Sequence, residues 1–189
     1  IQSLTTLQIS SLTSDEIAVL TTNQIQALTT LQVASLTTDQ VVALTTDQVS
    51  NLLTSQLVAI KTSQLVSLET DDLRAITTDQ IQSLTTLQIS SLTSDEIAAL
   101  TTGQIQALTT LQVAALTTDQ VVALTTDQVS NLQTSQLVAI KTSQLVSLET
   151  DDLQAITTEQ IQSFTSIQVA ALTTDQIVAL TTDQVSNLL

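Results

Sequence analysis

Large aliphatic residues recur along the chain with a period of eight, and the period does not slip. One series runs from Leu4 to Leu188, and each of its members is Leu, Ile or Phe. A second series runs from Ile1 to Val185 and contains only Ile, Val and Leu. Between them lie mostly Thr, Ser, Asp and Gln, so residues 44–51 read Leu-Thr-Thr-Asp-Gln-Val-Ser-Asn. An array of this kind predicts a stack of identical structural units.

The spacing of the two series distinguishes between backbone conformations. Separations of five and then three residues place neighbouring aliphatic side chains on opposite faces of a strand, which disfavours a simple half-buried strand. A β-solenoid needs turn residues such as Gly at its corners, and the chain has a single glycine, Gly103. In one continuous helix, eight residues advance by about 800°, so the aliphatic stripe drifts by about 80° per unit. We therefore predict an all-α solenoid, a superhelix of very short capped helices with one helix per eight-residue repeat.

Each repeat contains a sequence that is typical of a helix start. If the first Thr is the N-cap, Gln falls at position N3 and completes a capping box, with the two aliphatic residues at N′ and N4. A second register places the cap one residue later. The first Thr is replaced in six repeats, whereas the second position is always Thr or Ser, so we favour the second residue as the cap in at least those six repeats. The six replacements are Leu53, Lys61, Glu69, Gln133, Lys141 and Glu149.

A longer repeat is superimposed on the octads. Residues 81–160 nearly copy residues 1–80, and residues 161–189 begin a third copy, so we expect a single repeat array that is a window of a longer chain. Helices this short are unstable alone and must be stabilised by neighbouring turns. Leu replaces Asp at Leu7 and again three octads later at Leu31. This spacing predicts slightly more than three repeats per turn.

The composition excludes several kinds of chemistry. The chain of 189 residues contains no His, Cys, Met, Trp, Tyr or Pro, and it carries 18 acidic against 3 basic residues, a formal charge of −15. Without His or Cys there is no imidazole base, no thiolate nucleophile and no ordinary zinc site. Because phosphate neutralisation needs many basic residues, we expect no binding to nucleic acid. The longest apolar runs have four or five residues, so we expect no membrane insertion.

Carboxylates are the remaining candidates for a functional site. Calcium requires six to eight clustered oxygens, whereas each repeat supplies about one carboxylate, so solvated Asp at a helix start is the better interpretation. The pairs Asp71-Asp72 and Asp151-Asp152 make a glycosidase site conceivable, but no aromatic platform accompanies them. We therefore predict no enzyme activity, no catalytic, cofactor-binding or metal-binding residues and no cofactor, with calcium as a weak possibility. The regularly spaced carboxylates are Asp39, Asp47, Asp119, Asp127, Asp175 and Asp183.

Two further surface features keep alternatives open. The paired Thr residues are compatible with an ice-binding face, although a hydroxyl used for capping is not free to order water. Apolar residues that replace Asp either enlarge the core or form an exposed stripe for lateral association. Of these two interpretations we favour the core. The residues concerned are Leu7, Leu31, Leu87, Leu111 and Ile167.

Residues 36–44 and 116–124 read Leu-Thr-Thr-Asp-Gln-Val-Val-Ala-Leu, which resembles the first helix of a TAL-effector repeat. That family has a longer period and a DNA-reading glycine loop, so DNA binding is not carried over. Over its whole length the chain better resembles the Leu-Thr-Thr-x-Gln-Val octad arrays of giant bacterial exoproteins, which are labelled as adhesion or haem-utilisation proteins. This resemblance implies a structural role outside the cell or at its surface, and it supplies no ligand residues.

The sequence thus predicts a non-enzymatic structural repeat protein that forms an extracellular stalk, spacer or self-assembling filament. We expect self-association, either end to end or laterally. A surface adhesin or binding module and a Thr-array ice-binding protein are the alternatives. The negative charge keeps the surface of such an array soluble.

Overall fold

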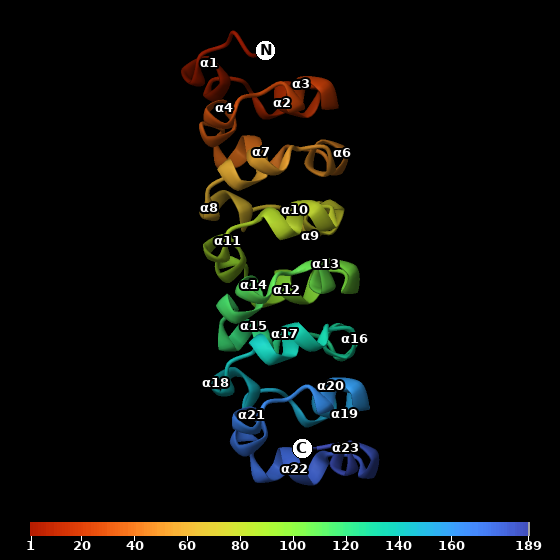
Figure 1. Cartoon of the computed structure of the whole chain (residues 1–189). Coiled ribbons are helices and arrows are strands. Elements are labelled where there is room, and N and C mark those ends of the chain that lie inside the picture. The colour runs from red at the N-terminus through yellow and green to blue at the C-terminus, as the bar shows by residue number, and fades with distance from the viewer. Residues whose placement is uncertain (189) are drawn as a thin grey trace. The chain divides into compact units, whose positions relative to one another are not determined.

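The computed structural model describes residues 1–188, and within them the secondary structure consists of helices of four to six residues without any strand. The chain divides into two compact units, the first spanning Ile1–Leu92 and the second beginning at Thr93. Each unit is a stack of short helices that change direction after every repeat (Figure 1). The predicted all-α solenoid is confirmed, with one helix for each eight-residue repeat.

The helices of the first unit are α1 (Thr6–Ser10), α2 (Ser14–Ala18), α3 (Thr22–Gln26), α4 (Thr30–Ala34), α5 (Thr38–Val42), α6 (Thr46–Ser50), α7 (Thr54–Ala59), α8 (Thr62–Leu65), α9 (Thr70–Ala75), α10 (Thr78–Ser83) and α11 (Thr86–Ser91). Those of the second unit are α12 (Ser94–Ala99), α13 (Thr102–Ala107), α14 (Thr110–Ala115), α15 (Thr118–Val122), α16 (Thr126–Ser130), α17 (Thr134–Ala139), α18 (Thr142–Leu145), α19 (Thr150–Ala155), α20 (Thr158–Gln162), α21 (Ser166–Ala171), α22 (Thr174–Ala179) and α23 (Thr182–Ser186).

A capping box starts most of these helices, as α5 illustrates. Thr37 has an extended backbone (φ −78°, ψ 165°), and its hydroxyl accepts a hydrogen bond from the backbone N–H of Gln40 at 3.2 Å. The side-chain Oε1 of Gln40 in turn accepts from the backbone N–H of Thr37 at 2.9 Å. The first Thr of the repeat is therefore the N-cap and the second Thr is N1. The repeated Thr-Thr-x-Gln pattern restarts the helix because it satisfies two of the free N–H groups at a helix start.

Our preference for the second hydroxyl as the cap was wrong in the six repeats that lack the first Thr. In α7 and α8 the N-caps are Leu53 and Lys61, neither of which makes a side-chain capping bond. The backbone N–H of Leu53 still donates to Oε1 of Gln56 at 2.8 Å. In these repeats the amide oxygen of Gln binds the N-cap backbone whatever side chain the N-cap carries. The N-caps Gln133 and Lys141 follow the same register through the same bond. Glu69 and Glu149 also keep this register, although Asp occupies N3 there and makes no such bond.

Both aliphatic series form the core. The N4 residues point inward, and Val41, Val49 and Leu57 are 0% exposed. Residues of the other series lie just before each N-cap, and Leu44 is a typical member at 3% exposed. Phe164, the single aromatic residue, occupies one of these positions and is also buried. A typical repeat therefore contributes two buried side chains, and neighbouring turns bury them together.

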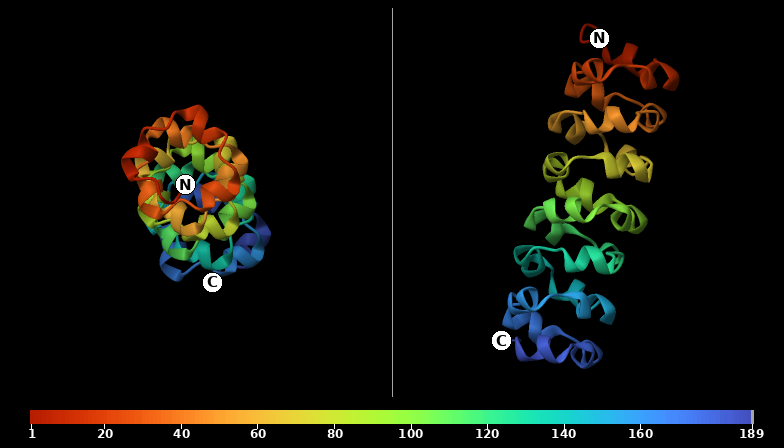
Figure 2. Two further views of the ribbon diagram at one scale, coloured as in Figure 1. Left: turned by 90° about the horizontal axis from the view of Figure 1, so that it is seen from above. Right: turned by 90° about the vertical axis from the view of Figure 1, so that its right-hand side faces the viewer.

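In each unit, helices stack on those three repeats further along the chain. In the first unit α4 contacts α7, and α7 contacts α10; in the second unit α16 contacts α19, and α19 contacts α22. The turns wind around a common axis within each unit, as the views in Figure 2 show. Side chains also bond to residues 28 and 31 positions earlier, between three and four repeats away. This confirms the prediction of slightly more than three repeats per turn.

Candidate functional site

The most frequent polar contact between turns is made by the Gln at position N3, and we call the hydrogen bonds of one such residue a glutamine seam. Besides closing the capping box, Gln40 donates from Nε2 to the carbonyl oxygens of Leu12 at 2.6 Å and Ile9 at 2.9 Å, which belong to the preceding turn. The side chain is 2% exposed. One amide therefore starts its own helix and joins that helix to the turn before it.

The second unit has the same seams. Gln136 accepts from the backbone N–H of Gln133 at 2.8 Å and donates to the carbonyl oxygens of Leu108 at 2.7 Å and Ile105 at 2.8 Å. The sequence pattern predicts the capping role of this Gln, whereas its bond to the preceding turn was not predicted. A signal was present, because Glu caps a helix start as well as Gln does, and yet Gln predominates at N3. The exceptions are Glu16, Asp72, Glu96 and Asp152.

The eight-residue repeat of this chain matches a known repeat family. The model of the ALTTAQ repeat family matches residues 1–30, 22–54, 65–102, 97–134, 129–166, 145–182 and 162–188. The chain belongs to the ALTTAQ repeat family. No curated protein matches it.

The letters of the ALTTAQ repeat correspond to structural positions in this chain. In residues 43–48, Ala-Leu-Thr-Thr-Asp-Gln, the small Ala43 ends one helix as its C-cap and Leu44 is buried in the core. Thr45 is the next N-cap and Gln48 makes the seam. The residue between Thr46 and Gln48 lies at N2 on the surface, where the structure imposes little constraint. The motif therefore specifies a helix end, a core residue, a helix start and an inter-turn bond.

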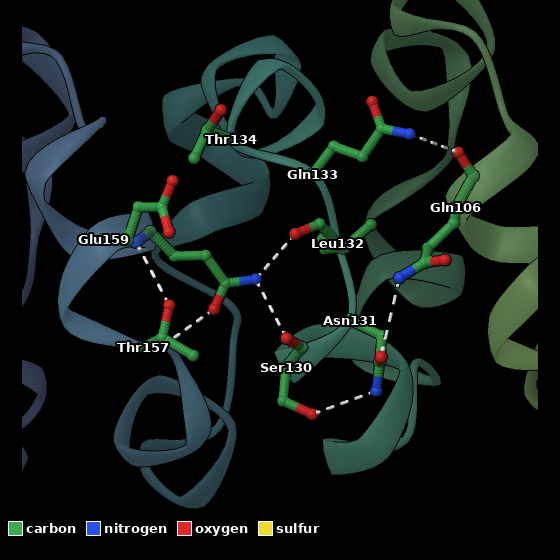
Figure 3. A pocket seen from close by; sticks show the side chains of 9 residues that line it. Gln106, Ser130, Asn131, Leu132, Gln133, Thr134, Thr157 and Glu159 are labelled. Carbon is green, nitrogen blue, oxygen red and sulfur yellow. Dashed lines mark hydrogen bonds between the residues drawn. The ribbon is translucent and has the colours of Figure 1, made fainter.

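A polar groove of about 300 Å³ opens on the second unit of this ALTTAQ array, between α13, the α16–α17 junction and α20 (Figure 3). Gln133 donates from Nε2 to the carbonyl oxygen of Gln106 at 3.1 Å along one side. Gln160 donates to the carbonyl oxygens of Ser130 at 3.0 Å and Leu132 at 2.6 Å. The groove is therefore lined by amides that already hold the turns together.

Glu159 supplies the carboxylate of this groove, and the other lining side chains are amides, hydroxyls and one Leu. Thr157, the N-cap of α20, uses its hydroxyl to accept from the N–H of Gln160 at 3.2 Å. A hydroxyl engaged in capping and a lone carboxylate do not make a nucleophile with its base. The arrangement can hydrogen-bond a polar surface, and it provides no pair of groups for acid–base chemistry.

The Asp residues that the sequence singled out lie at exposed N2 positions, as Asp39 and Asp127 illustrate. There they complement the positive end of the helix dipole. The paired carboxylates separate, because Asp151 is exposed whereas Asp152 is buried. Among the described residues, no three acidic side chains come together in a group that suits a metal ion. No helix in residues 1–188 has the length and apolarity needed to cross a membrane.

The apolar residues that replace Asp are on the surface, so our preference for a core location was wrong. Leu7 is 78% exposed, Leu31 74% and Ile167 74%. The physical reason is the helical register: N4 points toward the axis of the coil, and N2, two residues earlier, projects away from it. Leu87 and Leu111 lie at the same position and are similarly exposed.

Three buried carboxylates take the place of Gln at N3. Glu96 is 6% exposed and still accepts from the backbone N–H of Thr93 at 2.6 Å, whereas Asp72 and Asp152 make no capping bond. Asp72 is 7% exposed and Asp152 is 4% exposed. Burial raises the pKa of Asp72 above its ordinary value, and the charges of Glu69 and Asp71 raise it further. Burial also raises the pKa of Asp152; a hydrogen bond from the Thr126 hydroxyl at 3.0 Å acts in the opposite direction. Both of these carboxylates with a raised pKa lie at N3, where most repeats carry Gln.

Proposed function

We propose that this chain is a non-enzymatic structural protein that serves as an extracellular stalk or spacer and assembles into filaments. The observation that carries the proposal is the glutamine seam, which within each unit joins most repeats to the preceding turn through the same buried hydrogen bonds. Such an array gains length by adding repeats without any change in the local contacts. Its stiffness is then a property of the repeat, because bending requires seams and buried aliphatic contacts to open.

End-to-end association is the first assembly mode that we propose. In the first turn Gln8, Glu16 and Gln24 are exposed, whereas the corresponding Gln32 is 3% exposed because it packs on a preceding turn. In the last turn Val185 is 50% exposed. One edge thus presents amide donors and the other presents aliphatic side chains and carbonyl groups. A further turn, from the same chain or from another copy, would make the contacts already seen between turns.

Lateral association is the second mode, with another copy of this chain as the partner. Leu7 and Leu31 lie at N2 of α1 and α4, which contact each other in the first unit. Neither helix carries a charged residue, whereas many other helices have Asp at this position. The stripe formed by Leu7 and Leu31 is therefore an apolar surface with little local repulsion in a chain of net charge −15. An identical stripe on a second copy fits it in both polarity and charge.

Sedimentation velocity and negative-stain electron microscopy of the purified chain test both modes. We expect rods that lengthen as concentration rises and that also pair side by side. The variant Leu7→Gln/Leu31→Gln should abolish side-by-side pairing and leave the rods intact. The variant Gln8→Lys/Gln24→Lys should shorten the rods, because a charged group blocks stacking on the first turn. Strictly monomeric behaviour of the unmodified chain at high concentration would contradict the assembly proposal.

The extracellular location is a proposal that rests on the resemblance to exoprotein octad arrays. Antibody labelling of intact source cells tests it directly. Staining of intact cells is expected, and staining only after permeabilisation would contradict it.

An ice-binding surface is the second candidate, and one observation favours it. The cap register leaves several N1 hydroxyls free: Thr38 and Thr46 are exposed, and their side chains make no hydrogen bond within the described residues. The N1 hydroxyls of Ser14, Ser94 and Thr126, in contrast, donate hydrogen bonds to other helices. The purified chain at micromolar concentration should show thermal hysteresis if these hydroxyls order water. Absence of hysteresis would remove this candidate and leave the structural role unaffected.

A further inference from the structure

Asp72 in the first unit and Asp152 in the second replace the Gln of a glutamine seam. Each side chain is more than nine-tenths buried, at 7% and 4% exposed respectively. Asp is one methylene shorter than Gln, and as a carboxylate it accepts hydrogen bonds without donating any. Neither of the two bonds that define a seam is made at these positions.

Comparison with an intact seam identifies the two hydrogen bonds that are missing at Asp72 and Asp152. Gln48 accepts from the backbone N–H of its N-cap Thr45 at 2.9 Å and donates to the carbonyl oxygen of Leu20, in the preceding turn, at 2.6 Å. At Asp72 the corresponding groups are the N–H of Glu69 and the carbonyl oxygen of Leu44. Within residues 1–188 neither of these groups has a hydrogen-bond partner. The same holds for the N–H of Glu149 and the carbonyl oxygen of Leu124 at the second site.

The carboxylate nevertheless reaches the preceding turn. Oδ1 of Asp152 accepts from the hydroxyl of Thr126 at 3.0 Å, and Thr126 follows closely on Leu124 in the chain. The Asp72 side chain makes no hydrogen bond, although every fully buried side-chain oxygen or nitrogen among the described residues has a partner. The Asp72 oxygens therefore keep some contact with solvent, which gives a small ligand a path to the site.

Because α9 and α19 keep the helix register of the other repeats, we expect three polar groups to face one another at each position, as they do around an intact seam: one N–H donor, one carbonyl acceptor and one carboxylate acceptor. A neutral molecule with one acceptor and two donor sites matches this set, and water has this combination. Buried waters typically make about three hydrogen bonds to groups that lack other partners. A metal cation could bind the two oxygens, but the positive end of the N–H dipole would repel it, so a cation fits this set less well than water. Buried polar groups without partners are strongly disfavoured in proteins.

We propose that Asp72 and Asp152 each bind one buried water molecule that replaces the missing Gln amide. At the second site the water accepts from the Glu149 N–H and donates to the Leu124 carbonyl oxygen and to the Asp152 carboxylate. The first site uses Glu69, Leu44 and Asp72 in the same way. Because Asp72 and Asp152 occupy equivalent places in the long repeats 1–80 and 81–160, the array has one hydrated seam in each of them.

Crystallography at a resolution that shows ordered water tests this proposal. In the unmodified chain we expect density for a single water within hydrogen-bonding distance of Glu149 N, Leu124 O and the Asp152 carboxylate. In Asp72→Gln/Asp152→Gln the Gln amide should occupy that place, with Nε2 bonded to the Leu124 carbonyl oxygen. A direct bond from the Glu149 N–H to the carboxylate would overturn the proposal, as would an ion with six or more oxygen ligands.

Amide hydrogen exchange provides an independent test in solution. The Glu69 and Glu149 amides should exchange more slowly in the double Gln variant than in the unmodified chain, because a direct bond replaces a bond to exchangeable water. The matched control is Asp71→Gln/Asp151→Gln, which removes the same charges at the exposed neighbouring positions. Equal exchange rates in the unmodified chain and the double Gln variant would contradict the proposal, as would equal slowing in the control.

Discussion

The side-chain amide of Gln48 donates a hydrogen bond of 2.6 Å to the carbonyl oxygen of Leu20, a residue 28 positions earlier in the chain. The same carbonyl accepts no backbone hydrogen bond within the described residues. Each seam therefore satisfies a backbone group that the sharp turn between helices leaves free. Since an unpaired buried carbonyl costs about 1–3 kcal/mol, each seam stabilises the stack in addition to the aliphatic core.

Loss of the donor alone should weaken the stack. Gln48→Glu keeps an oxygen for the N-cap Thr45 and leaves the Leu20 carbonyl without its donor. We expect the free energy of unfolding to fall by about 1–3 kcal/mol at neutral pH, as measured by urea denaturation. Asn23→Asp is the control, because it makes the same change of charge at an exposed N2 position. An equal effect of the two substitutions would show that charge, and not the seam, is responsible.

Truncation of a core residue should be far more damaging than truncation of a nearby surface residue. Leu57 is 0% exposed and Leu53, the N-cap of the same helix, is 47% exposed. Leu57→Ala should lower the free energy of unfolding by about 2–5 kcal/mol because it removes buried methyl groups and leaves a cavity. Leu53→Ala should change it by less than about 1 kcal/mol. Similar losses for both variants in thermal denaturation would be inconsistent with the assigned faces.

The cap register can be tested by a gain of stability. Lys61 is an N-cap without a side-chain bond, so Lys61→Thr should create one and raise the free energy of unfolding by about 1 kcal/mol. Conversely, Thr45→Ala removes an existing cap and should lower it by about 0.5–2 kcal/mol. Thr46→Ala, at N1, serves as the control with a smaller effect. A larger loss from Thr46→Ala than from Thr45→Ala would support the alternative register.

Acidification should raise the free energy of unfolding through Asp72 and Asp152, the two Asp residues that replace Gln at N3. The pKa of Asp152 is raised in the folded chain, mainly by burial, so the folded state binds a proton more readily than the unfolded state. The destabilisation by this carboxylate is full at pH values above its raised pKa. It decreases as pH falls through the raised pKa, and it is lost below the ordinary value of 3.8. The same sign applies to Asp72.

Urea denaturation between pH 7 and pH 4 measures this effect. The double variant Asp72→Asn/Asp152→Asn should show a smaller rise in midpoint on acidification than the unmodified chain. Asp71→Asn/Asp151→Asn, at exposed positions, should retain most of the rise. The charges of Asp71 and Asp151 also raise these two pKa values, less than burial does. The remaining carboxylates on the packed elements are Glu149, Asp127 on α16 and Asp175 on α22 for Asp152, and Glu69 and Asp47 on α6 for Asp72. These carboxylates are the same in both variants, so their contribution to the pH dependence of stability cancels in the comparison. Identical pH profiles of the two variants would contradict the assignment of the effect to Asp72 and Asp152.

Much of the fold follows from local pattern. The period of eight predicts both core series, and Val41 and Leu44 are buried as that pattern requires. The Thr-Thr-x-Gln segment predicts a capping box, because a cap joins residues only three positions apart and does not depend on the rest of the fold. The lack of a hydroxyl at Lys61 and similar positions led to the wrong prediction that the following residue is the N-cap. The backbone N–H of Lys61 is satisfied by the Gln64 oxygen alone, so the N-cap does not need a hydroxyl.

The sequence by itself determined that helices restart every eight residues, that a Thr-Thr-x-Gln segment marks most helix starts, and which two series of residues form the core. Only the tertiary structure decided that Leu31 faces solvent and that the Gln amide binds a carbonyl of the preceding turn. The direction of an N2 side chain and the partner of a seam both depend on the pitch of the coil. That pitch results from the packing of whole turns against each other, whereas capping and hydrophobic spacing act within a single repeat.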